Sequence, residues 1–178
     1  MKAQKIKNYI QILGALLFGF AIHSCGIYSF TGASIPAGTE TFQVNYFENV
    51  AGNRPGSTIE PGLDRDFTLA LQDILINQTN LNLTNTNGDL VFEGEIVEYG
   101  ITPMSATAEN TAAQNRLTIS VNVRYFNVKK EDDNYETRFS FYYDFPAEQQ
   151  IFDIKDTAHA EIFERITQDI FNASLAKW

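Results

Sequence analysis

The chain has little of the chemistry on which most enzymes and metal proteins depend. Its 178 residues include one cysteine, Cys25, and two histidines, His23 and His159. A single thiol excludes an intramolecular disulfide and a cysteine cage for a metal ion. Two histidines are too few for a His-rich metal site and leave little scope for a His-dependent catalytic triad. The sequence also contains no Gly-rich phosphate loop and no Gly-x-Ser-x-Gly elbow. We therefore expect no cofactor, no metal site and no catalysis.

Basic residues are also scarce. The chain has 13 Lys and Arg against 22 Asp and Glu, a formal net charge of −9. Three of the lysines lie in the first seven residues, so the remainder is more acidic still. Nonspecific binding to nucleic acid needs a basic surface. We therefore expect no nucleic-acid partner and no broad electrostatic attraction to anionic lipid.

What the chain does have is one long apolar run, residues 10–22, near its N-terminus. Lysines precede this run, and the small residue Ser24 follows it, directly before Cys25. This is the layout of a secretory signal peptide, and the run is shorter than the ~20 residues that span a bilayer. We predict a signal peptide over 1–24 with cleavage between Ser24 and Cys25. A retained transmembrane anchor is the minor alternative.

The residues around the cysteine resemble the lipobox of bacterial lipoproteins. Ile22 and Ser24 fit that pattern, whereas His23 departs from it because a small or apolar residue is usual there. The resemblance implies that Cys25 is the lipidation site and carries acyl chains such as palmitate. Each buried CH₂ contributes ~0.8 kcal/mol, so two or more chains anchor a protein stably. Residues 25–40 would then be the lipidated N-terminus and its tether. The alternative is an ordinary secreted protein with an incidental cysteine.

Residues 41–178 have the periodicities of a single α+β domain. Alternating apolar residues predict strands, and apolar residues at three- and four-residue steps predict helices. The expected strands are 41–46, 90–99, 116–128 and 136–145, and the expected helices are 63–78 and 156–176, the second capped by Asp156 or Thr157. Segments 48–62 and 101–115 are expected to be loops, the second of them mobile.

The order strand, helix, three strands, helix predicts the fold. A helix between the first two strands favours a parallel pair, and the last three strands suit an antiparallel meander. We expect a two-layer α+β sandwich, a four-stranded mixed sheet with two helices on one face. The apolar residues of the last two strands are all odd-numbered, so the numbers of paired residues should sum to an even value, 262 or 264.

The polar face of this sheet carries the candidate binding residues. Arg124, Arg138 and Tyr142 share that face, and Arg116 lies at the start of its strand. Two arginines placed opposite or diagonally could hold a phosphate, or they could pair locally with Asp144 or Glu136. Glu93 and Glu95 flank Gly94, which is expected to mark a bulge or a close approach. As a hydrolase alternative, these two acids would line a deep cleft.

Segments along almost the whole mature chain resemble the LPS-assembly lipoprotein family (LptE), in the divergent form of Bacteroidota-like bacteria. The resemblance depends on the order of several short motifs, each weak alone. They are Cys25-Gly26-Ile27-Tyr28-Ser29-Phe30-Thr31-Gly32, Phe42-Gln43-Val44-Asn45-Tyr46-Phe47-Glu48-Asn49, the helix 63–78, Asp89-Leu90-Val91-Phe92-Glu93-Gly94-Glu95-Ile96, Asn115-Arg116-Leu117-Thr118-Ile119-Ser120-Val121 and Gln168-Asp169-Ile170-Phe171-Asn172.

The resemblance implies an outer-membrane lipoprotein facing the periplasm, with a single LptE-like domain over 41–178. It implies a plug and assembly subunit of the LPS translocon, seated in the lumen of the LptD β-barrel and helping to place lipopolysaccharide in the outer leaflet. No LPS-contact motif carries over, so Arg116, Arg124, Arg138 and Tyr142 are candidates for LPS or partner contact from their position alone. The alternative is a generic periplasmic lipoprotein that scaffolds or chaperones another outer-membrane complex.

Overall fold

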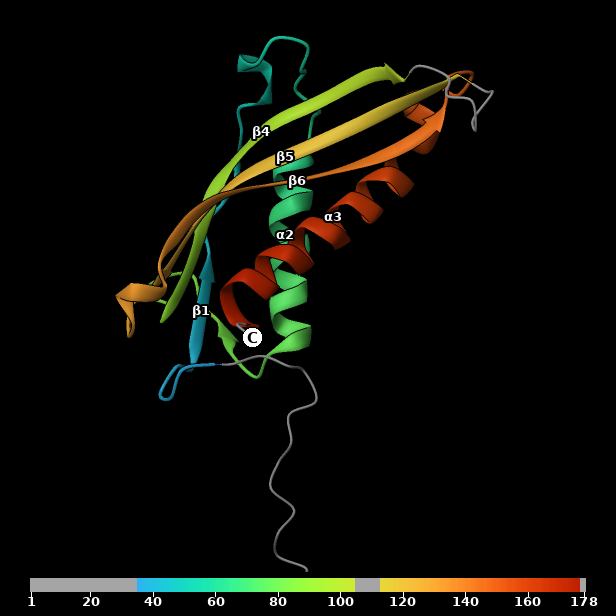
Figure 1. The fold of residues 1–178 in the computed structure, drawn as a ribbon. Coiled ribbons are helices and arrows are strands. Elements are labelled where there is room, and N and C mark those ends of the chain that lie inside the picture. Colours follow the sequence, from blue (N-terminus) through green and yellow to red (C-terminus); the bar gives the residue numbers. More distant parts are fainter. Residues whose placement is uncertain (1–34, 105–112, 177–178) are drawn as a thin grey trace, which may run out of the picture. The chain divides into compact units, whose positions relative to one another are not determined.

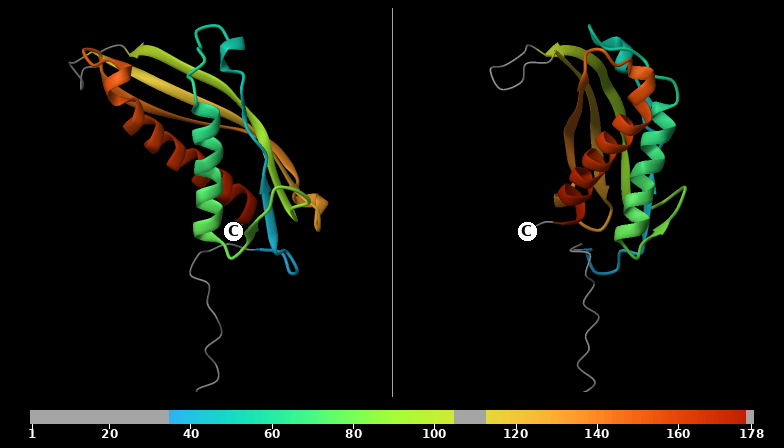
Figure 2. Two further views of the ribbon diagram at one scale, coloured as in Figure 1. Left: turned by 180° about the vertical axis from the view of Figure 1, so that it is seen from behind. Right: turned by 90° about the vertical axis from the view of Figure 1, so that its right-hand side faces the viewer.

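The computed structural model describes residues 35–104 and 113–176. The predicted signal peptide, Ser24, Cys25 and most of the 25–40 tether lie outside the described residues. The described residues form a mixed sheet with the helices α2 (Leu63–Gln78) and α3 (Ile151–Leu175) on the same side of it (Figure 2). The predicted α+β class, with two helices on one face of a mixed sheet, is therefore confirmed.

The sheet has six strands rather than the four expected. Its order is β3-β1-β4-β5-β6, and β2 pairs with β4 beside that path (Figure 1). The strands are β1 (Thr41–Val44), β2 (Glu48–Asn49), β3 (Asn82–Leu83), β4 (Leu90–Met104), β5 (Gln114–Asn127) and β6 (Tyr135–Pro146). The two missed strands have two residues each, too short for alternation to be visible, and tertiary pairing alone defines them. As predicted, β1 runs parallel to β4, and β4, β5 and β6 form an antiparallel meander.

Helix α2 has the bounds that its periodicity predicted. It follows Gly62, whose φ of +82° is readily available only to glycine. Asp64 in the first turn interacts favourably with the positive end of the helix dipole. Leu63, Phe67, Leu71 and Leu75 are fully buried at successive turns of the helix. The helix therefore buries one continuous apolar stripe against the sheet.

Strand β4 contains a bulge that reverses which residue numbers face the helices. The register with β5 shifts between Ile96 and Glu98. Before the shift, even-numbered Phe92 and Ile96 are buried; after it, odd-numbered Tyr99 is buried. Of the two alternatives expected at Gly94, a bulge or a close approach, the bulge is excluded because it lies further along the strand. Gly94 is instead a close approach, because a Cβ there would lie 1.9 Å from the carbonyl oxygen of Asn122.

In the β5–β6 hairpin the numbers of paired residues sum to an even value, as predicted, but the sum is 260 rather than 262 or 264. Arg116 therefore faces Asp144 and Arg124 faces Glu136, and Arg124 and Arg138 lie diagonally on one face.

The expected loop 101–115 is wrong at both ends, since β4 continues to Met104 and β5 begins at Gln114. Cross-strand pairing between these two ends extends the ladder despite their polar sequence, and residues 105–112 lie outside the described part.

Helix α3 begins at Ile151, five residues earlier than expected. Gln150 precedes it in extended conformation, so Asp156 and Thr157 are exposed residues within the helix rather than its cap. The early start lets Ile151 and Ile154 pack against the core. From there α3 runs diagonally across the sheet towards α2 (Figure 1).

The core lies between the helices and the sheet. Phe67 of α2 packs edge-on against Phe47, with ring centroids 5.1 Å apart, and against Phe163 of α3 at 5.5 Å. This aromatic row joins both helices to the segment between β1 and β2. Within 35–104 and 113–176, neither helix is both long and apolar enough to cross a membrane.

Candidate functional site

The face of β4, β5 and β6 that points away from the helices is polar, and we call it the open face. Even-numbered residues of β5 and β6 lie on it, because their odd-numbered neighbours pack against the helices. All four candidate contact residues, Arg116, Arg124, Arg138 and Tyr142, are on this face. Tyr142 and Phe126 add exposed aromatic surface, 43% and 39% exposed. The open face thus combines charged side chains with aromatic rings.

Arg116 and Asp144 form a paired unit across β5 and β6. Arg116 Nε donates to Asp144 Oδ1 at 2.7 Å, and Nη2 donates to Oδ2 at 2.8 Å. The hydrogen bond to Asp144 raises the pKa of Arg116 above its ordinary value. The guanidinium carbon also lies 3.5 Å from the ring centre of Tyr142, a cation–π contact. Arg116 therefore has a local carboxylate partner and an aromatic support.

Arg124 lies between two acids of β4. Its Nε donates to Glu93 Oε1 at 3.0 Å and its Nη1 to Glu95 Oε1 at 2.9 Å. The hydrogen bonds to Glu95 and then Glu93 raise the pKa of Arg124. The two acids are about one-third exposed on the face of the sheet and share this cation. They do not line the cleft that a hydrolase reading requires.

Glu98 is the centre of a second cluster on the open face. Arg138 Nη2 donates to Glu98 Oε2 at 2.5 Å, and Arg54 Nη1 lies 3.3 Å from the same oxygen. Ser120 Oγ donates to that oxygen at 2.8 Å and is 2.9 Å from Ser140 Oγ. Ser120, although it lies on the open face, is fully buried beneath this cluster. Two arginines share one carboxylate, so the cluster has an excess of positive charge.

Sequence reasoning missed Glu98 and Arg54 as members of this cluster. Glu98 has an even number, but the bulge turns it to the side that holds Glu93 and Glu95. Arg54 comes from the turn-rich segment between β2 and α2, which the bridge between Ser57 and Gly100 holds beside β4. Neither the bulge nor that bridge has a clear sequence signal. In the described part of the chain, no group of His, Cys, Asp and Glu is arranged to hold a metal ion.

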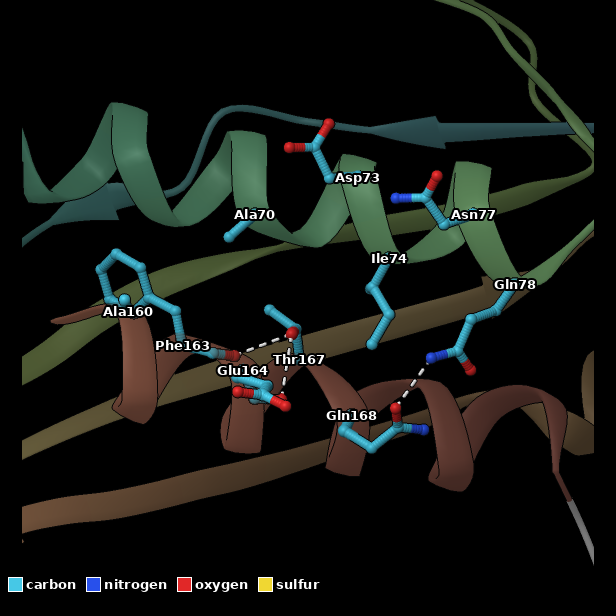
Figure 3. Close-up of a pocket in the computed structure, with 10 residues that line it drawn as sticks. All are labelled: Ala70, Asp73, Ile74, Asn77, Gln78, Ala160, Phe163, Glu164, Thr167 and Gln168. Carbon is cyan, nitrogen blue, oxygen red and sulfur yellow. Dashed lines mark hydrogen bonds between the residues drawn. The ribbon is translucent and has the colours of Figure 1, made fainter. Parts of the chain in front are cut away.

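A groove of about 420 Å³ lies on the other side of the molecule, between α2 and α3 (Figure 3). Ala70, Ile74 and Phe163 contribute its apolar surface, whereas Asp73 and Glu164 carry acids. A hydrogen bond of 2.8 Å from Gln78 to Gln168 joins the two helices at one end. The acids make this groove unsuitable for an anionic ligand. The open face is therefore the stronger candidate for recognition of a charged partner.

The described residues thus form a two-layer α+β domain with an ion-paired polar face. Residues 39–174 match the model of the LptE family, which is described as lipopolysaccharide-assembly. The chain therefore belongs to the LptE family of lipopolysaccharide-assembly lipoproteins, which is not a family of enzymes. No curated protein matches the chain.

Several solved structures are similar to this chain at low sequence identity. The hypothetical protein CT253 from Chlamydia trachomatis has a TM-score of 0.50 and 14% identity, and the match covers 78% of this chain and 99% of that one. A minor lipoprotein from Acinetobacter baumannii has a TM-score of 0.46 and 11% identity, with 79% and 98% covered. Rare lipoprotein B from Shewanella oneidensis has a TM-score of 0.41 and 11% identity, with 74% and 89% covered.

Proposed function

We propose that this chain is an outer-membrane lipoprotein on the periplasmic side, held by acyl chains on Cys25. It acts as the plug and assembly subunit of the LPS translocon, bound to an LptD-type β-barrel, and helps to insert lipopolysaccharide into the outer leaflet. The observation that carries this proposal is the family match over residues 39–174, which includes every strand and nearly all of both helices. The ordering of the signal peptide, lipobox and domain in the sequence supports the placement.

The open face suits the lumen of a barrel. The interior of such barrels is polar, and a surface that meets it must keep its charges paired or hydrated. Arg116 and Arg124 already have carboxylate partners at 2.7–3.0 Å. Their desolvation would therefore cost less than that of unpaired cations. Tyr142 and Phe126 would supply apolar contact within the same face.

Arg138 is the best of the candidate residues for contact with an anionic group of lipopolysaccharide. Arg116 and Arg124 are each matched by one or two acids, whereas Arg138 and Arg54 share Glu98 alone. An arginine pair of this kind can bind a phosphate through charge-assisted hydrogen bonds. The acidic balance of the rest of the chain confines such binding to this cluster.

Affinity purification of tagged full-length protein from detergent-solubilised outer membrane tests the proposal. Wild type is compared with Tyr142→Ala and Phe126→Ala on the open face and with Arg65→Ala, an exposed residue of α2, as the control. We expect a stoichiometric large β-barrel with wild type and Arg65→Ala, and less barrel with the open-face variants. If no barrel accompanies wild type in mild detergent, the plug role fails and the generic lipoprotein scaffold is favoured.

Two further variants separate the anchor from the ligand contact. Cys25→Ala should lose outer-membrane fractionation if the acyl chains are the main anchor; retention there would assign that role to the barrel. Arg54→Ala with Arg138→Ala should reduce co-purifying lipopolysaccharide while the barrel is still bound. Unchanged lipopolysaccharide in that double variant would remove the Glu98 cluster from the proposal.

A further inference from the structure

The two edges of the sheet differ in how well they are protected. On one side, β4 is covered in short pieces by β1, β2 and the bridge from Ser57 to Gly100. The outermost strand there, β3, has only two residues. On the other side β6 ends the sheet with twelve residues, and no described strand lies beyond it (Figure 1). A long open edge is a template for pairing with another extended chain.

The hydrogen-bond pattern between β5 and β6 determines which backbone groups of β6 point away from β5. The N–H of Ala147 donates to the carbonyl of Ala113, one step beyond the pairs of the β5–β6 ladder. Residues in an antiparallel strand bond alternately to one side and the other, so odd-numbered residues of β6 bond to β5. The residues whose N–H and C=O groups point away from β5 are Glu136, Arg138, Ser140, Tyr142 and Asp144.

The usual protections of an edge strand are weak in β6. The strand contains no lysine, its ladder with β5 has no register shift, and its proline is the last residue. Its exposed charged residues, Glu136, Arg138 and Asp144, are of both signs and can therefore pair with each other across a second copy. The side chains of Phe139, Phe141 and Tyr143 are only partly buried on the helix side. The open edge is therefore flanked by apolar surface that a further strand would cover.

We propose that two copies of this chain pair antiparallel through β6, with Phe141 opposite Phe141 of the second copy on the two-fold axis. The proposal rests on the geometry of β6 and concerns the chain when no barrel is bound, so it does not depend on the proposed function. Parity sets the first condition, because the apolar odd-numbered sets of both copies must lie on the same side of the joined sheet. The numbers of paired residues across the axis must then sum to an even value.

Among the even sums from 276 to 286, each of which pairs seven or more residues of β6 with the second copy, charge selects one register. A sum of 276 places Arg138 opposite itself, and a sum of 280 places Glu136 opposite Asp144, so both bring like charges together. Sums of 278, 284 and 286 place no opposite charges face to face. A sum of 282 places Arg138 opposite Asp144 of the second copy, and Ser140 opposite Tyr142. This register is the one centred on Phe141.

The same register extends the ion pairs already present on the open face. Within one copy Arg116 holds Asp144, and Arg138 holds Glu98. Pairing brings Asp144 of one copy beside Arg138 of the other. The result is a row of charges of alternating sign: Arg116 and Asp144 of the first copy, followed by Arg138 and Glu98 of the second copy. Because the outward groups belong to even-numbered residues, these charge pairs coincide with pairs that exchange backbone hydrogen bonds.

Disulfide trapping in the full-length chain tests the register. Cys25→Ala makes each introduced cysteine the single thiol. In the proposed dimer Phe141 and its copy form a non-hydrogen-bonded pair with Cα atoms about 4.5 Å apart, within the range of a disulfide. Phe141→Cys should therefore give a covalent dimer on mild oxidation. Phe139→Cys and Tyr143→Cys, which lie about 13 Å from their own copies, should not, but an equal mixture of the two should form a heterodimer.

The outcomes are distinct. Light scattering on the unmodified full chain in mild detergent should give a dimer that dissociates on dilution; a monomer at every concentration overturns the proposal. Equal cross-linking of Phe139→Cys and Phe141→Cys alone would indicate random collision or another register, and also overturns it. If circular dichroism shows that Phe141→Cys is unfolded, the mixture of Phe139→Cys and Tyr143→Cys tests the proposed register without it.

Discussion

The hydroxyl of Tyr99 in β4 lies 3.1 Å from Nε2 of His159 in α3, and this contact links the sheet to the helix near the start of α3. The imidazole is also stacked on Phe163, with ring centroids 5.8 Å apart. The imidazole is partly buried between the two layers. Burial lowers its pKa, although Glu60 opposes that effect. Burial raises the pKa of Tyr99 to about 12, so its hydroxyl stays protonated.

Stability should therefore fall as the pH drops through the range in which an unfolded histidine titrates. The unfolded chain binds a proton near pH 6.5, whereas the folded chain does so only at lower pH, so protonation favours the unfolded state. We expect the urea midpoint of wild type to decrease between pH 7.5 and 5. His159→Gln should flatten this dependence, and Tyr99→Phe should keep its slope. An equal slope in His159→Gln would assign the dependence to other groups.

Asp89 should contribute to stability at neutral pH and lose that contribution in acid. Its Oδ2 accepts the N–H groups of Glu40 and Thr41 at 2.8 and 3.1 Å, and Lys129 lies 3.2 Å from Oδ1. These partners, with the Glu40 bond the largest cause, lower the pKa of Asp89 from 3.8 to about 2. The stabilisation is complete above about pH 4 and disappears as the pH falls towards 2.

Asp89→Asn should accordingly cost about 1 kcal/mol at pH 7, a value reduced for its partial exposure. The difference from wild type should shrink in urea titrations as the pH approaches 2. Asp73→Asn, an exposed acid on α2, is the control and should change little. A difference that stays constant with pH would contradict the role of the charge.

Gly94→Ala should be strongly destabilising. The added Cβ would lie 1.9 Å from the carbonyl oxygen of Asn122 and 2.7 Å from a ring carbon of Phe47. Strand β5 or the aromatic row must move, at a cost of about 3 kcal/mol. Gly100→Ala in the same strand is the matched control, because its nearest atom would be 3.4 Å away. Chemical denaturation of the two variants should separate them clearly; similar midpoints would argue against the close approach.

Arg124→Ala should lower the stability of the domain, because two acids on the open face lose their shared cation. The substitution leaves Glu93 and Glu95 on one face of β4 without the cation that joins them. We expect a loss of about 1 kcal/mol at low ionic strength and a smaller loss in high salt, which screens exposed charges. Arg65→Ala on α2 should show little effect in either condition. A loss that does not respond to salt would indicate packing of the arginine stem instead.

Much of the fold could be predicted because the elements that form the core have strong local patterns. Helix α2 has the bounds that its apolar stripe indicated, and parity on β5 and β6 identified both the buried side and the open side. The short strands β2 and β3 could not be predicted, since two residues show no period. The exact register also could not, because parity allows every even sum and only packing selects 260.

The candidate site followed the same division. The sequence by itself determined the acidic balance, the family motifs and the placement of Arg116, Arg124, Arg138 and Tyr142 on one face, because these depend on composition, order and a period of two. The lipobox at Cys25 stays a prediction. The tertiary structure alone decided which acid each arginine meets. The bulge after Ile96 brings Glu98 to the open face, and the bridge at Gly100 brings Arg54 beside it. Such contacts depend on register and long-range pairing, which local periodicity does not encode.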